Sequence, residues 1–286
     1  MRELKILAVV VALTLITYWG VEPYAHHEMY PPVAPADFAF SDVKESVADV
    51  TALEGNATSG EALVTANCTA CHSIESKGFP QVMDNASSGS AYGVTPPDLG
   101  SAGKLYNATY LAAFIKDPAT ASRVAHKFVD GRAHPMPSYN WMQPQEIADM
   151  VAYLKSIAPK EMTNKEVFTD SCQRCHAIKY ADMKGGSMVA FTPKDDVKHY
   201  MGKLPPDLSQ YIKSRGHHYL ETFINSPEKH LEGTAMPRVG LNEESQAQAI
   251  TYLEEIGESK KAEREELGPK FLIYMVIFAI FGFLWK

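Results

Sequence analysis

The hydrophobic pattern divides the chain into two continuous apolar ends and an amphipathic middle. Leu4 to Gly20 contains Lys5 as its one charge, and Phe271 to Trp285 contains none. Because a helix rises about 1.5 Å per residue, the first segment would span about 25 Å. The second is short for a span, but Lys270 and Lys286 flank it, and such side chains reach up to the membrane surface. Both segments are therefore predicted to be transmembrane helices.

The first apolar segment has a second interpretation, a cleaved signal peptide. Signal cleavage requires small residues at alternate positions, whereas large side chains fill much of the stretch from Tyr18 to Tyr24. Tyr18 and Trp19 instead fit the aromatic belt of a membrane interface. Basic residues before the apolar run place the N-terminus in the cytoplasm. With both ends cytoplasmic, residues from 22 to 267 would share the outer compartment.

A proline-rich stretch follows the first apolar segment. Proline fixes φ and lacks an amide hydrogen, so a run of prolines resists helix and sheet alike. We therefore predict an extended stalk over residues 22–54. Its prolines are Pro23, Pro31, Pro32 and Pro35.

The middle of the chain is an internal repeat. Five short blocks recur in the same order, offset by 99 to 109 residues. Such a repeat indicates two copies of one domain, which we place at 55–158 and 159–260, between anchors at 1–21 and 261–286. The paired blocks are Cys68-Thr-Ala-Cys71-His72 with Cys172-Gln-Arg-Cys175-His176, Pro96-Pro97-Asp98-Leu99 with Pro205-Pro206-Asp207-Leu208, Tyr110-Leu111 with Tyr219-Leu220, Met136-Pro137 with Met236-Pro237, and Tyr153-Leu154 with Tyr252-Leu253.

Each copy is expected to begin and end with a helix. Gly60 to Asn67 and Lys165 to Ser171 would lead into the cysteines, whereas Pro144 to Ile157 and Glu243 to Ile256 would close the copies. Proline suits the first helical position, and Asn242 is a plausible N-cap for the last helix. The stretches between these helices are rich in Gly, Ser and Pro and carry few strand signals. The fold class predicted is all-α.

Charge and cysteine content narrow the function. The formal net charge of −7 disfavours nucleic acid as a partner, because nucleic-acid binding depends on neutralising phosphates with Lys and Arg. All four cysteines fall in the two C-x-x-C units, which leaves none for a structural disulfide.

The motif C-x-x-C-H is the attachment signature of c-type haem. Positions i, i+3 and i+4 of a helix share one face, so two thiols can bond covalently to the edge of a porphyrin while the imidazole reaches the iron. We therefore predict two covalently bound haem c groups. The residues are Cys68, Cys71 and His72 for the first, and Cys172, Cys175 and His176 for the second.

Two other interpretations of the cysteines are weaker. Four cysteines could hold zinc, but each pair occupies its own repeat and is followed by a histidine that zinc does not require. A thioredoxin-like redox motif normally occurs once, near a βαβ pattern that the sequence lacks.

Methionine is the expected sixth ligand of both irons. Met136 and Met236 hold matching repeat positions, 64 and 60 residues after the respective histidines. The competitors, His134 and His230, do not align with each other. A His/Met pair is usual in electron-carrying cytochromes c and raises the reduction potential. Since two protein ligands leave no open position on iron, we expect one-electron transfer, with no catalytic residues and no catalysis by this chain alone.

Each repeat resembles a class I cytochrome c domain. The whole arrangement is similar to the dihaem cytochrome c subunit of some bacterial quinol–cytochrome c reductases (cytochrome bc complex, complex III). The resemblance implies cytochrome b and Rieske iron–sulfur subunits as partners, and a soluble cytochrome c or a terminal oxidase as acceptor. It places the haem domains on the periplasmic side of a bacterial inner membrane. It also implies that a backbone carbonyl of the Pro96-Pro97 and Pro205-Pro206 segments orients each histidine, although these segments would serve equally as simple turns.

Two alternatives remain open. The dihaem subunit of a cbb-type terminal oxidase normally has an N-terminal anchor without a C-terminal one. A dihaem peroxidase would need one haem without a methionine ligand. The better-known reductase subunit has one haem and one C-terminal anchor, so its docking contacts cannot be transferred to this chain.

Overall fold

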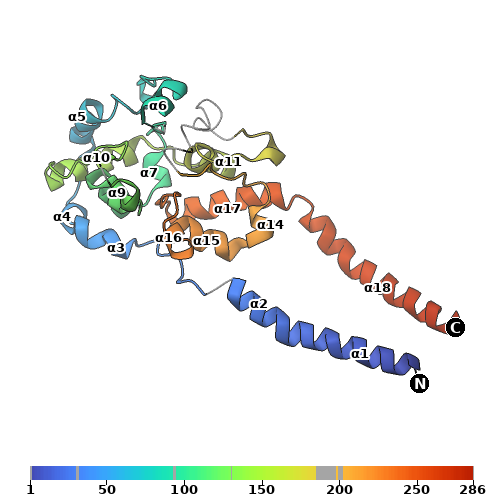
Figure 1. Ribbon diagram of the computed structural model, residues 1–286. Coiled ribbons are helices and arrows are strands. Elements are labelled where there is room, and N and C mark those ends of the chain that lie inside the picture. Colours follow the sequence, from blue (N-terminus) through green and yellow to red (C-terminus); the bar gives the residue numbers. More distant parts are fainter. Residues whose placement is uncertain are drawn as a thin grey trace. The chain divides into compact units, whose positions relative to one another are not determined.

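The computed structural model describes residues 2–29, 32–92, 95–129, 131–184, 198 and 202–285, and these form a helical protein (Figure 1). In this part of the chain, β pairing is limited to three isolated bridges. The all-α prediction is therefore confirmed. The chain separates into two compact units, residues 1–35 and 36–286.

The smaller unit holds α1 (Arg2–Ile16), a π-helical turn (Thr17–Val21) and α2 (Glu22–Met29). Short helices predominate in the larger unit, with two long ones near its end. Its helices are α3 (Ser41–Lys44), α4 (Ala48–Thr51), α5 (Ala57–Asn67), α6 (Asn85–Tyr92), α7 (Ala102–Leu105), α8 (Ala108–Lys116), α9 (Pro118–Ala121), α10 (Pro144–Ile157), α11 (Asn164–Phe168), α14 (Tyr211–Arg215), α15 (His217–Asn225), α16 (Pro227–His230), α17 (Glu243–Gly257) and α18 (Lys261–Trp285), with 3₁₀ turns at Glu45–Val47, Glu75–Lys77, Ala125–Lys127 and Lys179–Ala181 and a π turn at Thr169–Gln173.

The first repeat is built around the crossing of α5 and α10. The crossing is close because Gly60 has no side chain: a Cβ there would lie 2.0 Å from the Asp149 carbonyl oxygen. Asn56 begins α5 by accepting two backbone N–H bonds, and Pro144 stands in the first turn of α10, as predicted. The predicted bounds of α10 are confirmed, whereas α5 begins three residues earlier than predicted.

The second repeat packs α11 against α17. Thr163 and Glu166 form a capping box at the start of α11, and the predicted N-cap Asn242 accepts the Ser245 N–H. The buried side chains of Phe168 and Ile250 join the two helices in one core. The predicted helix over Lys165 to Ser171 instead changes from α to π geometry after Phe168.

The two repeats share a packed interface. Leu105 of the first repeat is 1% exposed and belongs to the core of the second. Its neighbour Tyr106 forms an isolated antiparallel bridge with Leu241. The domains are thus joined through buried side chains and backbone pairing as well as through the chain that connects them.

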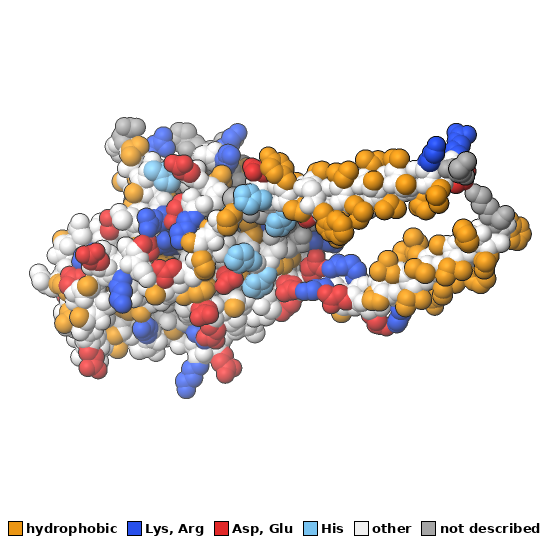
Figure 2. All heavy atoms as spheres, turned by 90° about the horizontal axis from the view of Figure 1, so that it is seen from below, with side chains coloured by type: hydrophobic (Ala, Val, Ile, Leu, Met, Phe, Trp, Pro, Cys, Tyr) orange, Lys and Arg blue, Asp and Glu red, His pale blue; other side chains and the backbone are white. Residues whose placement is uncertain are grey.

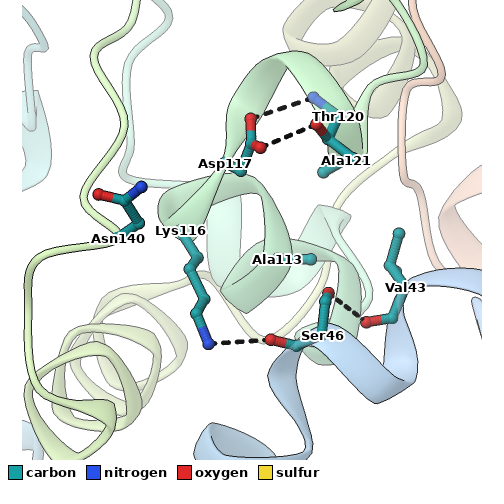
Figure 3. A pocket seen from close by; sticks show the side chains of 8 residues that line it. All are labelled: Val43, Ser46, Ala113, Lys116, Asp117, Thr120, Ala121 and Asn140. Carbon is teal, nitrogen blue, oxygen red and sulfur yellow. Dashed lines mark hydrogen bonds between the residues drawn. The ribbon is translucent and has the colours of Figure 1, made fainter.

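The predicted stalk over 22–54 is wrong for most of its length. Phe40 and Val47 are at most 1% exposed and pack in the core of the first domain. The short helices of this segment lie against α8, where Lys116 donates to the Ser46 carbonyl oxygen over 2.9 Å (Figure 3). Val43 and Val47, at helical spacing, are buried in this core, and the prolines of the predicted stalk all precede the buried part.

The start of the predicted stalk is also helical. Residues Glu22 to Met29 continue the first helix, and Pro23 is the second residue after the π turn. Proline lacks an amide hydrogen, and the wider turn before it, closed by the Glu22 N–H bond to Thr17 O, accommodates it. Pro31 lies outside the described residues.

The two terminal helices have apolar surfaces. Among the described residues, Arg2–Met29 and Lys261–Trp285 are long and apolar enough to cross a membrane by length and composition. Figure 2 shows hydrophobic side chains along both, while the visible surface elsewhere is mixed. Their large apolar side chains are exposed. At about 1.5 Å per residue, α18 is about 37 Å long, which exceeds the hydrocarbon core of a bilayer.

The helix crossing gives a stability prediction. Gly60→Ala should lower the free energy of unfolding of the haem-loaded protein by about 1–3 kcal/mol, because its methyl group overlaps the backbone of α10. Ser59→Ala, on the exposed side of α5, is the control and should change it by less than about 0.5 kcal/mol. Denaturant titration in detergent measures both. Equal effects of the two variants would contradict the close crossing.

Candidate functional site

The first C-x-x-C-H motif forms a single helical turn at the end of α5. The His72 N–H bonds to the Cys68 carbonyl oxygen at 2.8 Å, and the Cys71 N–H bonds to the same oxygen at 3.1 Å. These bonds continue the helical path beyond Asn67. The two thiols and the imidazole therefore project from one turn, as their spacing predicts.

The second motif repeats this turn. The His176 and Cys175 N–H groups bond to the Cys172 carbonyl oxygen at 2.9 and 3.0 Å. The preceding π turn ends inside the motif, at Gln173. The local backbone is thus the same in both copies, although the helices that lead into it differ.

A prolyl carbonyl orients each histidine. His72 Nδ1 lies 2.7 Å from Pro97 O, and His176 Nδ1 lies 2.8 Å from Pro206 O. A carbonyl oxygen can only accept, so Nδ1 carries the proton. Burial lowers the pKa of both imidazoles, which keeps the rings neutral. A neutral ring protonated at Nδ1 has a bare Nε2, the form that binds a metal. The orienting role that the resemblance implies is confirmed.

The same Pro-Pro-Asp-Leu blocks also close turns. The Asp98 carboxylate accepts the Glu75 and Gly100 N–H groups at 2.9 and 2.7 Å. Asp207 accepts the Lys179 and Ser209 N–H groups at 2.9 and 3.2 Å. Both interpretations of these blocks are therefore correct, since the aspartate fixes the loop and the proline before it presents the carbonyl.

The four cysteines form no disulfide. Burial raises the pKa of Cys68 to about 12 and that of Cys172 to about 11. Within the described ranges, no three His, Cys, Asp or Glu side chains gather in a group that could hold a metal ion. The zinc interpretation therefore has no support, because the four cysteines do not meet.

The two predicted methionines occupy equivalent half-buried positions in separate loops. The Met136 N–H bonds to His134 Nδ1 at 3.2 Å, and the Met236 N–H bonds to Thr234 Oγ1 at 3.2 Å. In both copies, a side chain two residues earlier fixes the backbone of the methionine. These bonds fix the methionine backbones and do not test whether the sulfurs bind iron. Iron ligation by Met136 and Met236 stays a prediction.

Other protein groups contact the rings of His134 and His230, the two alternatives to methionine as iron ligands. His230 Nε2 lies 2.8 Å from Thr222 Oγ1, and the ring centroids of His230 and Tyr219 are 4.7 Å apart. The His134 ring lies edge-on to Phe128, with centroids 4.9 Å apart, and its Nδ1 faces the Met136 backbone. The contact at His230 engages Nε2, whereas that at His134 involves only Nδ1, so the preference for methionine rests on the matching repeat positions of Met136 and Met236.

The second motif lies against the loop of the first domain that presents Pro97 O to His72. The sequence did not reveal this contact. The Arg174 guanidinium, between the two cysteines of that motif, donates to Thr95 O at 2.5 Å. The Ser101 hydroxyl bonds to the Asp170 carboxylate just before the motif. Thr95 and Ser101 flank the loop that presents Pro97 O. In the first motif the position of Arg174 is Ala70, so the charge belongs to one copy only.

A surface pocket of about 220 Å³ lies elsewhere (Figure 3). It is lined by residues of α3, α8, α9 and nearby loops, and by none of the motif residues. The Asp117 carboxylate, which lines the pocket, accepts hydrogen bonds from the Thr120 N–H and hydroxyl at 3.2 and 2.8 Å. The pocket is therefore separate from the candidate haem sites.

The donor set fits haem c. Each copy supplies two thiols and a neutral imidazole on one turn, with the metal-binding nitrogen left bare by a hydrogen bond from Nδ1. This is the set of groups that covalent attachment and iron ligation need.

Comparisons with known proteins agree with this site. The family model described as cytochrome c matches residues 57–158 and 163–257. A cytochrome c-553-like protein of Synechocystis sp. (strain ATCC 27184 / PCC 6803 / Kazusa) is 30% identical over 125 residues, which is 44% of this chain and 91% of the relative. No solved structure matches the chain. Two tandem domains, each built on an attachment motif with an oriented histidine, place this chain in the cytochrome c family, whose members bind haem c covalently and transfer electrons.

Proposed function

We propose that the chain is a membrane-anchored dihaem cytochrome c of a bacterial quinol–cytochrome c reductase. It would accept single electrons from a Rieske iron–sulfur protein and pass them to a cytochrome c or a terminal oxidase. The observation that carries the dihaem part of the proposal is the duplication of the histidine site: turn, carbonyl partner and aspartate-closed loop recur in both domains. The reductase part rests on the resemblance of two such domains between two apolar helices.

Each domain's own residues have separate roles in this proposal. Cys68, Cys71, Cys172 and Cys175 would hold the porphyrins covalently, and His72 and His176 would bind iron through Nε2. Met136 and Met236 would complete the coordination and raise the potential of the metal. The bound haem would supply reversible one-electron oxidation and reduction.

The packing of the domains supports transfer from one haem to the other. The attachment motif of the second domain contacts the loop that orients the histidine of the first, through Arg174 and Asp170. The two haems would therefore lie on opposite sides of the contact between the second motif and the loop that orients His72.

The terminal helices support the membrane part of the proposal. Two apolar helices at the two ends of one chain would hold the domains between them on one side of a membrane. The basic residues Arg2 and Lys5 before the first apolar run favour a cytoplasmic N-terminus and a periplasmic location for the domains. A helix at each end distinguishes this chain from the cbb-type oxidase subunit, which normally has only the first.

Haem content tests the two-site proposal. The purified chain should hold two haems that resist extraction by acidified acetone. Replacing Cys68 and Cys71 by Ala should remove one, as should replacing Cys172 and Cys175, because each pair holds its own cofactor. Pyridine haemochrome spectra with a protein assay measure the ratio. A ratio of one in the native chain would contradict the proposal.

Extraction in a gentle detergent tests the assignment to a complex. Cytochrome b and a Rieske protein should co-purify with the chain. A copper- and haem-containing catalytic subunit in their place would refute the reductase assignment and leave the haem sites unaffected.

Arg174 gives an electrostatic prediction. Its positive charge beside the His72 loop disfavours oxidised iron, so Arg174→Gln should lower the potential of the first haem by on the order of tens of millivolts, where about 59 mV is a tenfold change for one electron. Arg174→Lys, which keeps the charge, should recover most of the shift. Potentiometric titration checks both. Equal shifts in the two variants would indicate altered packing rather than charge.

A further inference from the structure

The segment that follows Met236 is bound to the other domain. The Arg238 N–H donates to Ser122 O at 2.9 Å, and the Tyr110 hydroxyl donates to Arg238 O at 2.7 Å. Ser122 and Tyr110 belong to the first domain, at α9 and α8. The backbone two residues after the methionine is therefore held on both sides by residues more than 100 positions away.

Gly240 allows this segment to approach closely. A Cβ at Gly240 would lie 1.9 Å from the ring of Tyr110, and its φ of +80° is one that side-chain-bearing residues rarely adopt. The Asn107 N–H bonds to Gly240 O at 3.0 Å, and the Asn242 N–H bonds to Leu105 O at 3.0 Å. The segment thus pairs with the first domain along its backbone before α17 begins.

The side chain of Arg238 reinforces the contact. It is 4% exposed, and its guanidinium lies 2.8 Å from the Asp42 carboxylate and 3.0 Å from Ser226 Oγ. It also lies over the Phe40 ring, 5.6 Å from the centroid. Breaking a buried ion pair leaves an uncompensated charge, so this arrangement strongly favours one position of the segment.

The matching segment of the first domain is held differently. After Met136, the Tyr139 N–H bonds to Ile115 O at 3.2 Å, and the Ser138 hydroxyl donates to Lys116 O at 2.5 Å. The Tyr139 hydroxyl donates to Asn67 O at 2.8 Å. All of these partners lie within the first domain, so the described bonds tie this methionine loop to its own domain.

We propose that the first domain positions the methionine ligand of the second haem. Tyr110 and Gly240 act as positioning residues: they hold residues 238–241 on α8, and this keeps the sulfur of Met236 on its iron. The methionine ligation of the second haem would then depend on domain docking, whereas that of the first would not. This inference rests on the proposed function, specifically on Met236 as a ligand.

The principal test is Gly240→Ala in the full-length, haem-loaded protein. Its methyl group would push the segment off Tyr110, so one haem of two should lose the charge-transfer absorption of thioether-bound ferric iron. The redox equilibrium of that haem should shift at least tenfold toward the ferric form, which is about 59 mV for one electron. Tyr110→Phe keeps the ring and removes the hydroxyl, and should cause a smaller shift of the same sign. If Gly240→Ala does not fold, the shift caused by Tyr110→Phe tests the proposal instead.

Double variants identify the haem affected. Gly240→Ala should add nothing to Met236→Ala, since both remove the same ligand. Combined with Met136→Ala, it should leave neither haem with a methionine ligand. Unchanged spectra and potentials in folded Gly240→Ala and Tyr110→Phe proteins would refute the inference, as would equal losses at both haems. If Met236→Ala itself has no effect, the ligand assignment of the proposed function fails instead.

A matched control is an ion pair that crosses the same domain interface outside residues 238–241. The Lys104 ammonium of α7 lies 2.9 Å from the Glu244 carboxylate of α17. Glu244→Gln weakens this exposed contact and should leave both potentials unchanged. A shift equal to that of Gly240→Ala would mean that any weakening of the interface disturbs the second haem, which would overturn the specific role of residues 238–241.

Discussion

The hydrogen bond from each histidine to a prolyl carbonyl is the constraint on which the rest of the molecule depends. An imidazole binds iron only when the facing nitrogen has no proton and the ring stands at the correct angle. The Pro97 and Pro206 oxygens fix both properties, because an acceptor at Nδ1 determines the tautomer and the direction of the ring. Burial adds to this by disfavouring the charged ring.

Much of the surrounding fold holds those two carbonyls in place. In each copy an aspartate directly after the second proline ties its loop to the 3₁₀ turn that follows the motif. The leucine after it bonds back to the residue that follows the histidine: Leu99 N–H to Ser73 O, and Leu208 N–H to Ala177 O, both at 2.9 Å. In each site, hydrogen bonds from the histidine, the aspartate and the leucine therefore tie the motif turn to the proline loop. The helices α5, α10, α11 and α17 support these turns.

Local signals in the sequence predicted the parts that local physics determines. Pro144 and Asn242 marked helix starts because capping depends on the residues of the first turn alone. The spacing of the C-x-x-C-H motifs predicted their shared turn for the same reason. The internal repeat predicted two similar domains without any knowledge of their contacts.

Contacts between distant parts of the chain were not predictable in this way. The segment around Phe40 was included in the predicted stalk because prolines precede it in the sequence, whereas the helix against which it packs cannot be read from the sequence. Arg174 occupies one of the two unspecified positions of the C-x-x-C-H motif, and nothing in the motif indicates that it reaches the other domain. Gly240 gave no sign of its role, since a glycine required by a neighbouring ring cannot be told from one in any turn.

The burial of Cys68 has a consequence for where a cofactor would lie. Its side chain is 9% exposed, follows directly on α5 and packs within the core of the first domain. A haem bonded to this sulfur would therefore have one edge inside that core. The porphyrin would then be a structural part of the domain, and its loss would unsettle the same side chains that pack α5 against α10.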